Sequence, residues 1–394
     1  MSVKLTRLVL ALAAAIPTLA LADTGPQYVI QDLGAVSPYL YSQTFGVSDN
    51  ANYAIGRSLY IDTNSTPGSA WPASIYNVST ATLQGQSGLA GHPWSWGYGI
   101  NNTGVGVGFS ATTTSGAGAV PVMFVNGTTT QLAMPGGQSV GHAYGINNNG
   151  LAVGSLGGGV DEVGAVYNTV TGKTLVINAL TSAGSYMQTA FGISDNGLIV
   201  GAGVDSGNHN IAVVYNMNTG TMIDLPQPAL GGSPSSLAFG ISADGHYVVG
   251  SSGNTGQPMI WDLSGSTPSF TMAALPSISS GGSLRDVNVQ GWAVGNSGGV
   301  YSNPFLVADG QSYLLSDIVT NPAGWNFTTT TSASAMGIAA DGTIVGTAKL
   351  NGVEHMYMAT LAAAVPEPST YALMIGGLFA VGLRARRRAA TNEA

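Results

Sequence analysis

"HAYGINNNGLAVGS" (residues 142–155) holds one of seven copies of the same phrase, and these copies decide the fold. In this copy an Asn-Gly pair stands between two short apolar runs, a strong short-range signal of a β-hairpin, and we expect a type I′ turn at Asn149-Gly150. The copies begin at residues 46, 99, 145, 192, 240, 286 and 337, so their starts lie 46 to 53 residues apart. A strand-rich repeat of this length predicts the blades of a β-propeller.

Each hairpin is followed by two further strand-like runs around a glycine-containing turn, as in residues 163–180. One repeat is therefore predicted to be four antiparallel strands. The last repeat has only a third strand, 354–361, whereas residues 27–34 look like a fourth strand with no hairpin before it. Pairing of 27–33 with 354–361 would complete a seventh blade and remove two open sheet edges. We predict an all-β, seven-bladed propeller closed by the N-terminal strand; six blades or an open array are the alternatives.

Two glycines recur in every phrase except the sixth, which has Asp286 in place of the first. Gly145 and its counterparts fall on the first strand of each repeat, the strand expected nearest the axis, where a missing Cβ helps close packing. Gly154 and its counterparts are expected to end the second strand. We interpret both sets as structural, because a nucleotide-binding glycine loop would need a following helix and the pattern indicates none.

The composition excludes several classes of partner and chemistry. Charged residues are 7% of the 394 residues, against about 25% in an ordinary domain. Residues 23–368 contain 17 acidic and 4 basic side chains, a net charge of −13. Such a body repels phosphate backbones, so we expect no nucleic-acid partner. There is no cysteine, which rules out disulfides, thiol catalysis and cysteine-based zinc sites.

Both ends of the chain read as targeting segments. Residues 1–22 combine two cations, an apolar run and small residues before Asp23, as in a secretory signal peptide. The propeller is predicted over 23–361 and a linker over 362–370, followed by a short apolar transmembrane helix over 371–383. Residues 384–394 form a basic tail, whose arginines fix that end on the cytoplasmic side of the inner membrane. These arginines are Arg384, Arg386, Arg387 and Arg388.

The linker contains the triplet Pro366, Glu367 and Pro368. A Pro-Glu-Pro triplet, a short apolar span and an arginine tail, in this order, resemble the PEP-CTERM sorting signal of Gram-negative bacteria. The resemblance implies that this protein is the substrate of an exosortase, which recognises the triplet, and that it is delivered to the cell surface or the extracellular matrix. The phrases "QTAFGISDNG" and "GHAYGINNNG" also resemble the HAF family of extracellular repeats, which implies no catalytic residues.

No pattern in the chain predicts a catalytic, metal or cofactor site. The Asn and Asp residues of the hairpins are most simply turn residues, and the five histidines lack the spacing of metal ligands. Arg285 and Asp286 stand where other repeats carry an aromatic residue or Met followed by Gly, a position that would let both charges face the central channel, although the favoured interpretation is a local ion pair in a diverged blade.

Aromatic residues are the candidate ligand contacts. We expect Tyr39, Tyr41, Trp94 and Trp96, together with Tyr98, on the connections that enter the first two blades, where such rings could stack on sugar faces. Packing between blades is the favoured interpretation. We therefore expect a non-enzymatic binding or structural protein of the cell surface or matrix, linked to exopolysaccharide and biofilm. The alternative is a secreted polysaccharide hydrolase or lyase with carboxylates at the propeller opening.

Overall fold

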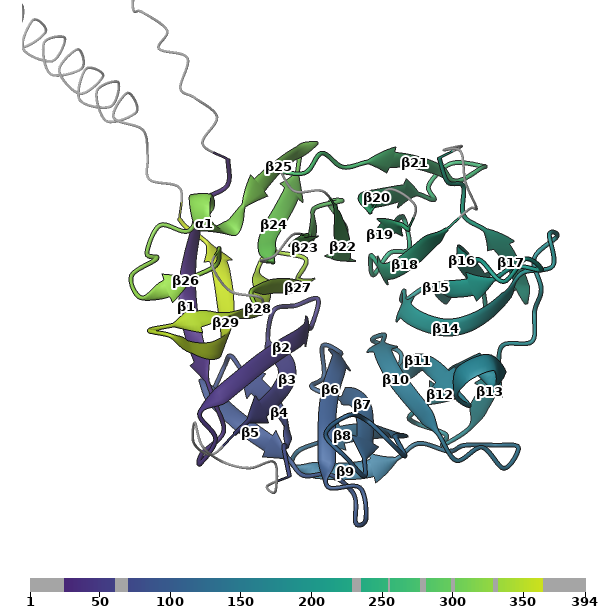
Figure 1. Cartoon of the computed structure of the whole chain (residues 1–394), viewed down its shortest axis with the longest axis horizontal. Coiled ribbons are helices and arrows are strands. Elements are labelled where there is room, and N and C mark those ends of the chain that lie inside the picture. Colours follow the sequence, from purple (N-terminus) through teal and green to yellow (C-terminus); the bar gives the residue numbers. More distant parts are fainter. Residues whose placement is uncertain are drawn as a thin grey trace, which may run out of the picture.

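The structure is a computed structural model that describes residues 25–60, 70–228, 235–253, 256–276, 281–298, 302–328 and 332–363. In these residues the strands form seven antiparallel sheets, arranged as blades around a central channel (Figure 1). The first strand of each blade lies nearest the channel and the last lies at the rim. The all-β class and the seven blades predicted from the repeats are confirmed.

Six blades are four-stranded meanders in chain order. Blade 1 consists of β2 (Tyr41–Val47), β3 (Tyr53–Leu59), β4 (Ala73–Asn77) and β5 (Thr82–Gln86). Blade 2 consists of β6 (Trp94–Ile100), β7 (Gly106–Ala111), β8 (Val120–Val125) and β9 (Thr128–Gln131). Blade 3 consists of β10 (Gly141–Ile146), β11 (Leu151–Leu156), β12 (Val163–Asn168) and β13 (Thr174–Val176). Blade 4 consists of β14 (Tyr186–Ile193), β15 (Leu198–Val204), β16 (Asn210–Asn216) and β17 (Thr221–Asp224). Blade 5 consists of β18 (Ser236–Ile241), β19 (Tyr247–Ser252), β20 (Gln257–Asp262) and β21 (Ser269–Met272). Blade 6 consists of β22 (Gly282–Val287), β23 (Ala293–Ser297), β24 (Asn303–Ala308) and β25 (Gln311–Leu314). The described helical segments are a 3₁₀ turn, Gly159–Asp161, and α1 (Leu315–Ile318).

Blade 7 joins the two ends of the propeller. It contains β27 (Ser334–Ile338), β28 (Ile344–Leu350), β29 (Val353–Leu361) and, outermost, β1 (Tyr28–Gly34), while the two-residue β26 (Trp325–Asn326) also pairs with β28. The register of β1 on β29 runs from Tyr28 opposite Leu361 to Gly34 opposite Met356. The side chain of Asn321 clamps β1 further, since its Oδ1 accepts from the Ile30 amide (2.7 Å) and its Nδ2 donates to the Ile30 carbonyl (3.0 Å). The predicted ring closure is confirmed.

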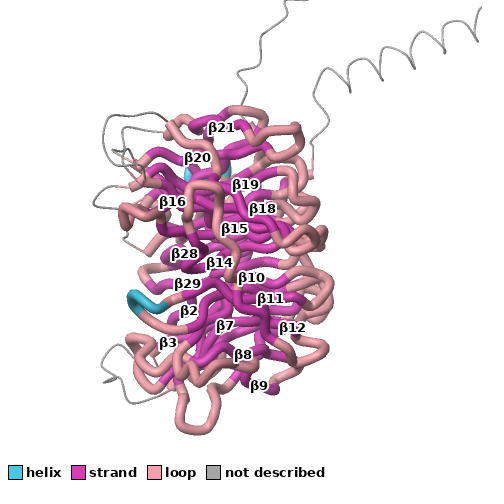
Figure 2. The backbone as a smooth tube through the Cα atoms, turned by 90° about the vertical axis from the view of Figure 1, so that its right-hand side faces the viewer, coloured by secondary structure: helices cyan, strands magenta, loops and turns pink. Residues whose placement is uncertain are grey.

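The hydrophobic core is divided among the faces of neighbouring blades. Between blades 3 and 4, for example, Val153 and Val166 pack with Ile199 and Val213. Clusters of the same kind join every neighbouring pair, including blades 6 and 7 and blades 7 and 1. Figure 2 shows the strands crossing the body and the loops gathered on its two faces. Both faces of each blade are therefore buried, and the loops and the channel remain for binding.

The first strand of every blade contains a β-bulge, and this explains the second recurring glycine. The register of β10 on β11 shifts between Ala143 and Gly145. At the bulge, a Cβ on Gly154 would lie 1.9 Å from the carbonyl oxygen of His142, too close for any side chain. The expectation that Gly154 ends the second strand was wrong: it lies inside β11, opposite Ala143. Its counterparts have the same close contact at 1.7–2.0 Å: Gly56, Gly108, Gly201, Gly250, Gly295 and Gly346.

The inner hairpin turn differs from the predicted type I′. The Gly150 amide donates to the Asn147 carbonyl (3.2 Å), and only Gly150, at φ 75°, has a positive φ in this turn. A type I turn followed by a left-handed glycine fits these values, whereas type I′ needs two positive φ angles. Paired positive φ angles occur instead in three other hairpins, at Asn126-Gly127, Asp309-Gly310 and Asn351-Gly352.

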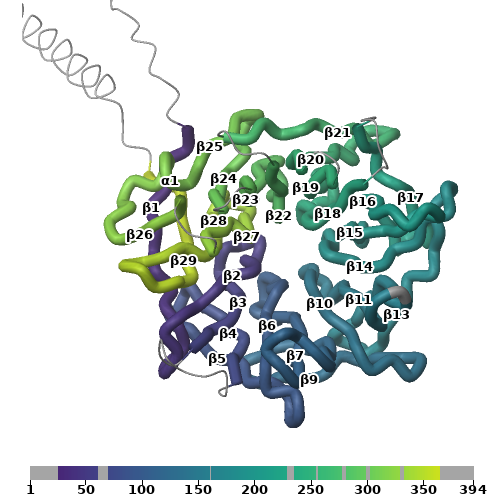
Figure 3. Tube along the Cα trace, in the orientation of Figure 1, coloured from purple at the N-terminus to yellow at the C-terminus, as the bar shows by residue number. Residues whose placement is uncertain are grey.

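The described chain begins and ends at one place. The Ala362 amide donates to the Gln27 carbonyl (2.8 Å), so the start of β1 and the end of β29 lie side by side at the rim of blade 7 (Figure 3). The predicted signal peptide (1–22), sorting triplet, transmembrane helix (371–383) and arginine tail lie outside the described residues. Among the described residues no helix is long and apolar enough to span a membrane.

Candidate functional site

The extra residue of each bulge lines the central channel. A bulge leaves one residue unpaired and re-aims its side chain; here it points the side chain toward the axis of the propeller. From blade 1 to blade 7 these residues are Phe45, Tyr98, Tyr144, Phe191, Phe239, Arg285 and Met336. All seven are half-buried, so each keeps part of its surface open to the channel.

Five of these side chains form an unbroken series of ring contacts, which we call the aromatic arc. Successive ring centroids are 4.9 Å (Phe45–Tyr98), 5.3 Å (Tyr98–Tyr144), 5.4 Å (Tyr144–Phe191) and 5.6 Å (Phe191–Phe239) apart. These separations fall within the range of favourable aromatic pairs. The arc therefore presents a continuous aromatic surface to the channel across blades 1 to 5.

Arg285 extends the arc into blade 6. Its guanidinium carbon lies 4.4 Å from the centroid of the Phe239 ring, in a cation–π contact. Its Nε is buried and has no hydrogen-bond partner in the part of the chain that the structure describes. Burial lowers the pKa of Arg285. Arg285 and Asp286 both line the channel, and no ion pair joins them among the described residues, so the favoured expectation of a local ion pair was wrong.

A second, polar ring lies at the inner hairpin turns. Asn148 is at its centre: its backbone amide donates to Asp195 Oδ1 (2.8 Å), and its Nδ2 donates both to Asp195 Oδ2 (2.9 Å) and to Asp49 Oδ2 (3.0 Å). Asp49 belongs to blade 1 and Asn148 to blade 3, so this bond skips blade 2. In blade 2 the Asn102 amide donates to Asn148 Oδ1 (2.9 Å), which continues the ring. Hydrogen bonds thus hold two carboxylates from different blades within reach of one amide.

A third carboxylate comes from Asp286, which replaces the first recurring glycine. Asp286 Oδ1 accepts from the Val287 amide (2.9 Å), and its Oδ2 accepts from the Ile338 amide of blade 7 (2.9 Å). Burial raises the pKa of Asp286 to about 7, the two amide donors oppose this rise, and the negative charge of Asp49 adds to it. Burial also raises the pKa of Asp49, an effect that its bond to Asn148 opposes and the charge of Asp195 reinforces.

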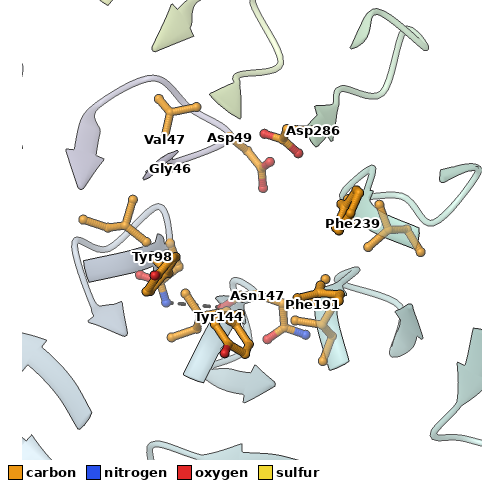
Figure 4. A pocket seen from close by; sticks show the side chains of 18 of the residues that line it. Gly46, Val47, Asp49, Tyr98, Tyr144, Asn147, Phe191, Phe239 and Asp286 are labelled. Atoms are coloured by element: carbon orange, nitrogen blue, oxygen red, sulfur yellow. Dashed lines mark hydrogen bonds between the residues drawn. The ribbon is translucent and has the colours of Figure 1, made fainter. Parts of the chain in front are cut away.

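The two rings enclose a cavity of about 280 Å³. The aromatic arc, Arg285, Met336 and the three carboxylates Asp49, Asp195 and Asp286 all line it. Figure 4 shows Asp49 and Asp286 near one another on one side of the opening, with Tyr144, Phe191 and Phe239 around the rest. A concave apolar surface with a few converging polar groups is the usual form of a small-ligand site.

Of the aromatic residues named from the sequence, Tyr98 belongs to the aromatic arc, whereas the other four lie elsewhere. Trp94 (8% exposed) and Trp96 (5% exposed) are on β6 rather than on a connection, and both are buried between blades 1 and 2. Tyr39 and Tyr41 pack against the same cluster, where the Tyr39 hydroxyl donates to the Ala70 carbonyl and Tyr41 meets Tyr60 edge to face. Packing between blades, the interpretation favoured from the sequence, describes the positions of Trp94 and Trp96. Tyr39 and Tyr41 are half-buried beside the same cluster, and Tyr39 also lines a second pocket together with Pro72 and Pro93.

The side-chain amide of Asn147, in the hairpin turn of blade 3, forms hydrogen bonds with the backbone. Asn147 Oδ1 accepts from the amides of Asn149 (3.1 Å) and Leu151 (3.0 Å), and its Nδ2 donates to the Ser194 carbonyl of blade 4 (3.0 Å). Three histidines pair with aspartates instead of with one another, as in His355–Asp32 (2.9 Å). Within the described ranges no group of three or more His, Cys, Asp or Glu side chains could hold a metal ion.

Sequence reasoning missed most of the cavity. The signal was present in the column before the recurring glycine, which is aromatic in five repeats. Without the bulge, a strand alternates its faces, and that column could not be assigned to the channel. The proximity of Asp49 and Asp195 could not be predicted from the sequence, because it depends on hydrogen bonds that the side chain of Asn148, in another blade, makes to both.

Comparisons with known proteins identify one end of the chain and the fold of its body. Residues 364–388 match the PEP-CTERM protein-sorting motif, including the predicted triplet and arginines. A solved oligogalacturonate lyase in complex with manganese is similar to this chain, with a TM-score of 0.53 and 13% identity over 86% of this chain and 94% of that one. An oligogalacturonate lyase from Vibrio parahaemolyticus is also similar, with a TM-score of 0.51 and 11% identity over 85% and 94%.

At such low identity these likenesses show the fold alone. No curated protein matches the chain. The HAF resemblance is not shown by any comparison and stays a prediction. The matched motif implies export, a membrane-anchored sorting signal and processing by an exosortase. The chain is an exported, exosortase-sorted protein whose body is a seven-bladed β-propeller.

Proposed function

We propose that this protein is a non-catalytic binding protein of the cell surface or extracellular matrix, and that its central cavity holds a sugar of the surrounding exopolysaccharide. The aromatic arc is the observation that carries the proposal. Four consecutive ring contacts place a curved aromatic wall inside the channel. Aromatic faces suit the apolar faces of sugar rings, and the carboxylates and Arg285 supply hydrogen-bond partners for hydroxyl groups.

The energetics of the channel support a binding role over a purely structural one. Leaving five apolar rings half-exposed to the channel, and burying Arg285 Nε without a hydrogen-bond partner, both cost stability. The inter-blade clusters already supply the stability of the ring. A cavity of about 280 Å³ lies at the lower limit of typical ligand sites, about 300 Å³, so it suits one sugar unit or chain end.

A second candidate is a secreted polysaccharide hydrolase or lyase, and one observation favours it. Asp286, whose pKa is raised to about 7, shares the cavity with Asp49. Near neutral pH such a pair can supply one protonated and one ionised carboxyl group, the requirement for acid–base cleavage of a glycosidic bond.

One experiment tests both candidates. The full chain, purified in detergent, is incubated with the exopolysaccharide of the producing bacterium and then sedimented, and the polysaccharide is assayed for new reducing and unsaturated ends. We expect co-sedimentation without new ends, and weaker co-sedimentation for Tyr144→Leu. New ends that disappear in Asp286→Asn would replace the binding role by the enzymatic one. Absence of both co-sedimentation and new ends would contradict both candidates.

A further inference from the structure

We propose that the ligand of the central cavity carries a positive charge, and that its chemical class is an amino sugar with a free ammonium group at the end of a polysaccharide chain. This inference rests on the proposed binding function and deepens it, since it names the class of sugar. It follows from the charges that share the cavity with the aromatic arc, and it excludes uronic acids and neutral sugars as the preferred ligand.

The carboxylates of the cavity outnumber its cations. Asp49, Asp195 and Asp286 line it, and Arg285 is the one basic side chain among its described lining residues. Arg285 is held over Phe239 in blade 6 and makes no ion pair with these carboxylates in the described part of the chain. The negative charge therefore has no internal counter-ion. Burial and the charge of a neighbouring carboxylate raise the pKa values of Asp49 and Asp286, and a bound cation would lower both values.

Asp49 has an oxygen available to a ligand. Its Oδ2 accepts from Asn148, whereas no donor among the described residues reaches its Oδ1. Both oxygens of Asp195 accept from Asn148, and both oxygens of Asp286 accept from backbone amides. An ammonium group at this place can donate to Asp49 directly and to the remaining lone pairs of the other two carboxylates.

The aromatic arc adds attraction for the same charge. The face of an aromatic ring is negative, so a cation within about 6 Å of a ring centroid is stabilised, more strongly where water is excluded. The chain already uses this interaction for its own cation, because Arg285 occupies the face of Phe239. In the described part of the chain no Lys or Arg lies over the ring of Phe191, Tyr144 or Tyr98. The ring of Phe45 has one such contact, with Arg57 at 5.7 Å from its centroid.

The net negative charge of the protein's body attracts the same cationic ligand at long range. Residues 23–368 carry a net charge of −13, and a cavity lined by one sign of charge concentrates ligands of the opposite sign. Anionic polysaccharide would be repelled both by this field and by the three carboxylates of the cavity. Neutral sugars would gain stacking on the aromatic arc and hydrogen bonds to their hydroxyl groups, but no charge-assisted contact.

The test uses three probes: the β-1,4-linked hexamers of glucosamine and of N-acetylglucosamine, and the α-1,4-linked hexamer of galacturonic acid. Each is titrated calorimetrically into the detergent-solubilised full chain at pH 6.5, at low and at high salt. We expect the glucosamine hexamer to bind about tenfold more tightly than its acetylated counterpart, as one charge-assisted contact provides, and the galacturonic acid hexamer not to bind.

Three variants locate the interaction. Asp49→Asn and Asp286→Asn should each lower the preference for glucosamine about tenfold. Asp286→Gly is the second variant at this position, because it restores the residue of the other six repeats and keeps the backbone geometry. Asp309→Asn is the matched control: it removes one negative charge outside the cavity, where asparagine tolerates the φ of 51° and can still accept from Trp292 Nε1 (3.2 Å).

The outcomes separate the two proposals. Equal binding of the glucosamine and acetylated hexamers, or binding of galacturonic acid, would overturn the charge inference and leave the sugar-binding function in place. An equal loss of preference in Asp309→Asn would also overturn it, because the attraction would then come from the surface as a whole. No binding of any hexamer, together with no co-sedimentation of exopolysaccharide, would overturn the binding function itself.

Discussion

Blades 3 and 6 form the same inner bulge with opposite chemistry. In blade 3 the bulge carries Tyr144 followed by Gly145, and a Cβ on that glycine would lie 2.7 Å from the Phe191 carbonyl oxygen of the next blade. In blade 6 the same two positions hold Arg285 and Asp286, and the Asp286 carboxylate bonds to the Ile338 amide of the next blade. The contact between neighbouring blades is thus made by close backbone approach in one case and by a charged side chain in the other.

The difference separates the scaffold from the site. The bulge, the opposing second-strand glycine and the inner turn are common to both blades, as Gly154 and Gly295 illustrate. The side chains that the bulge aims at the channel vary. We call the bulge, the second-strand glycine and the inner turn the constant frame. We expect the constant frame to determine stability and the two varying bulge residues to determine function, and substitutions at either can test this separation.

The largest expected effect comes from the constant frame. Gly154→Ala would place a Cβ 1.9 Å from the His142 carbonyl oxygen, both atoms being held by the strand pairing. We expect a loss of at least about 3 kcal/mol in the free energy of unfolding, at the upper limit of overpacking effects. Urea titration followed by tryptophan fluorescence measures it. Gly158→Ala is the control, since nothing lies within 4 Å of its Cβ position, and it should leave stability unchanged or slightly higher.

The second effect concerns the charged replacement in blade 6. Because burial raises the pKa of Asp286 to about 7, the folded state binds more protons than the unfolded state between pH 4 and 7, roughly the span between the ordinary aspartate pKa and the raised value. The contribution of Asp286 to the stability of the native protein should therefore fall as the pH rises through this range and level off above it. Asp286→Asn should remove about 2 kcal/mol of this decline, half of the full linkage value because the side chain is partly open to water.

Thermal unfolding of both proteins at pH 4.5, 6 and 8 measures the difference. The other carboxylates of the cavity are present in both proteins, so the comparison isolates Asp286. Parallel pH profiles for the two proteins would refute the assignment of a raised pKa to this residue.

A smaller effect is expected at Arg285. Arg285→Met introduces the residue that blade 7 carries at the same position, Met336. It removes a buried Nε that lacks a partner, which costs about 1–3 kcal/mol, and a cation–π contact worth about 0.5–2 kcal/mol. We expect the protein to become about 1 kcal/mol more stable. A loss of stability would make Arg285 part of the scaffold instead.

Much of the constant frame could be predicted from the sequence, and little of the site. The repeat period, the turn glycines and the unmatched strand at 27–34 were sufficient for seven blades and for the pairing of β1 with β29, because these features depend on local pattern and on counting. The aromatic residues proposed from clustering, Trp94 and Trp96, are inter-blade packing residues. A bulge of one residue reverses which side chains face the axis, and no residue type in the sequence predicts where such a bulge occurs.

The smallest expected effect removes a single oxygen from the aromatic arc. Tyr144→Phe makes blade 3 resemble blade 4, whose bulge carries Phe191. The Tyr144 hydroxyl has no hydrogen bond among the described residues, so stability should change by less than about 0.5 kcal/mol. Differential scanning calorimetry checks this value. A larger loss would mean that this hydroxyl belongs to the frame.

The most direct test of a channel site on a constant scaffold compares two phenylalanines. Phe191 belongs to the aromatic arc, whereas Phe270 is on the outer strand β21 and packs between blades 4 and 5. Affinity for the native exopolysaccharide is measured for Phe191→Leu and Phe270→Leu in the full chain. We predict a loss of about tenfold for Phe191→Leu, as expected for one lost stacking contact, and no change for Phe270→Leu. Unchanged affinity in Phe191→Leu, or equal losses in both variants, would contradict the account.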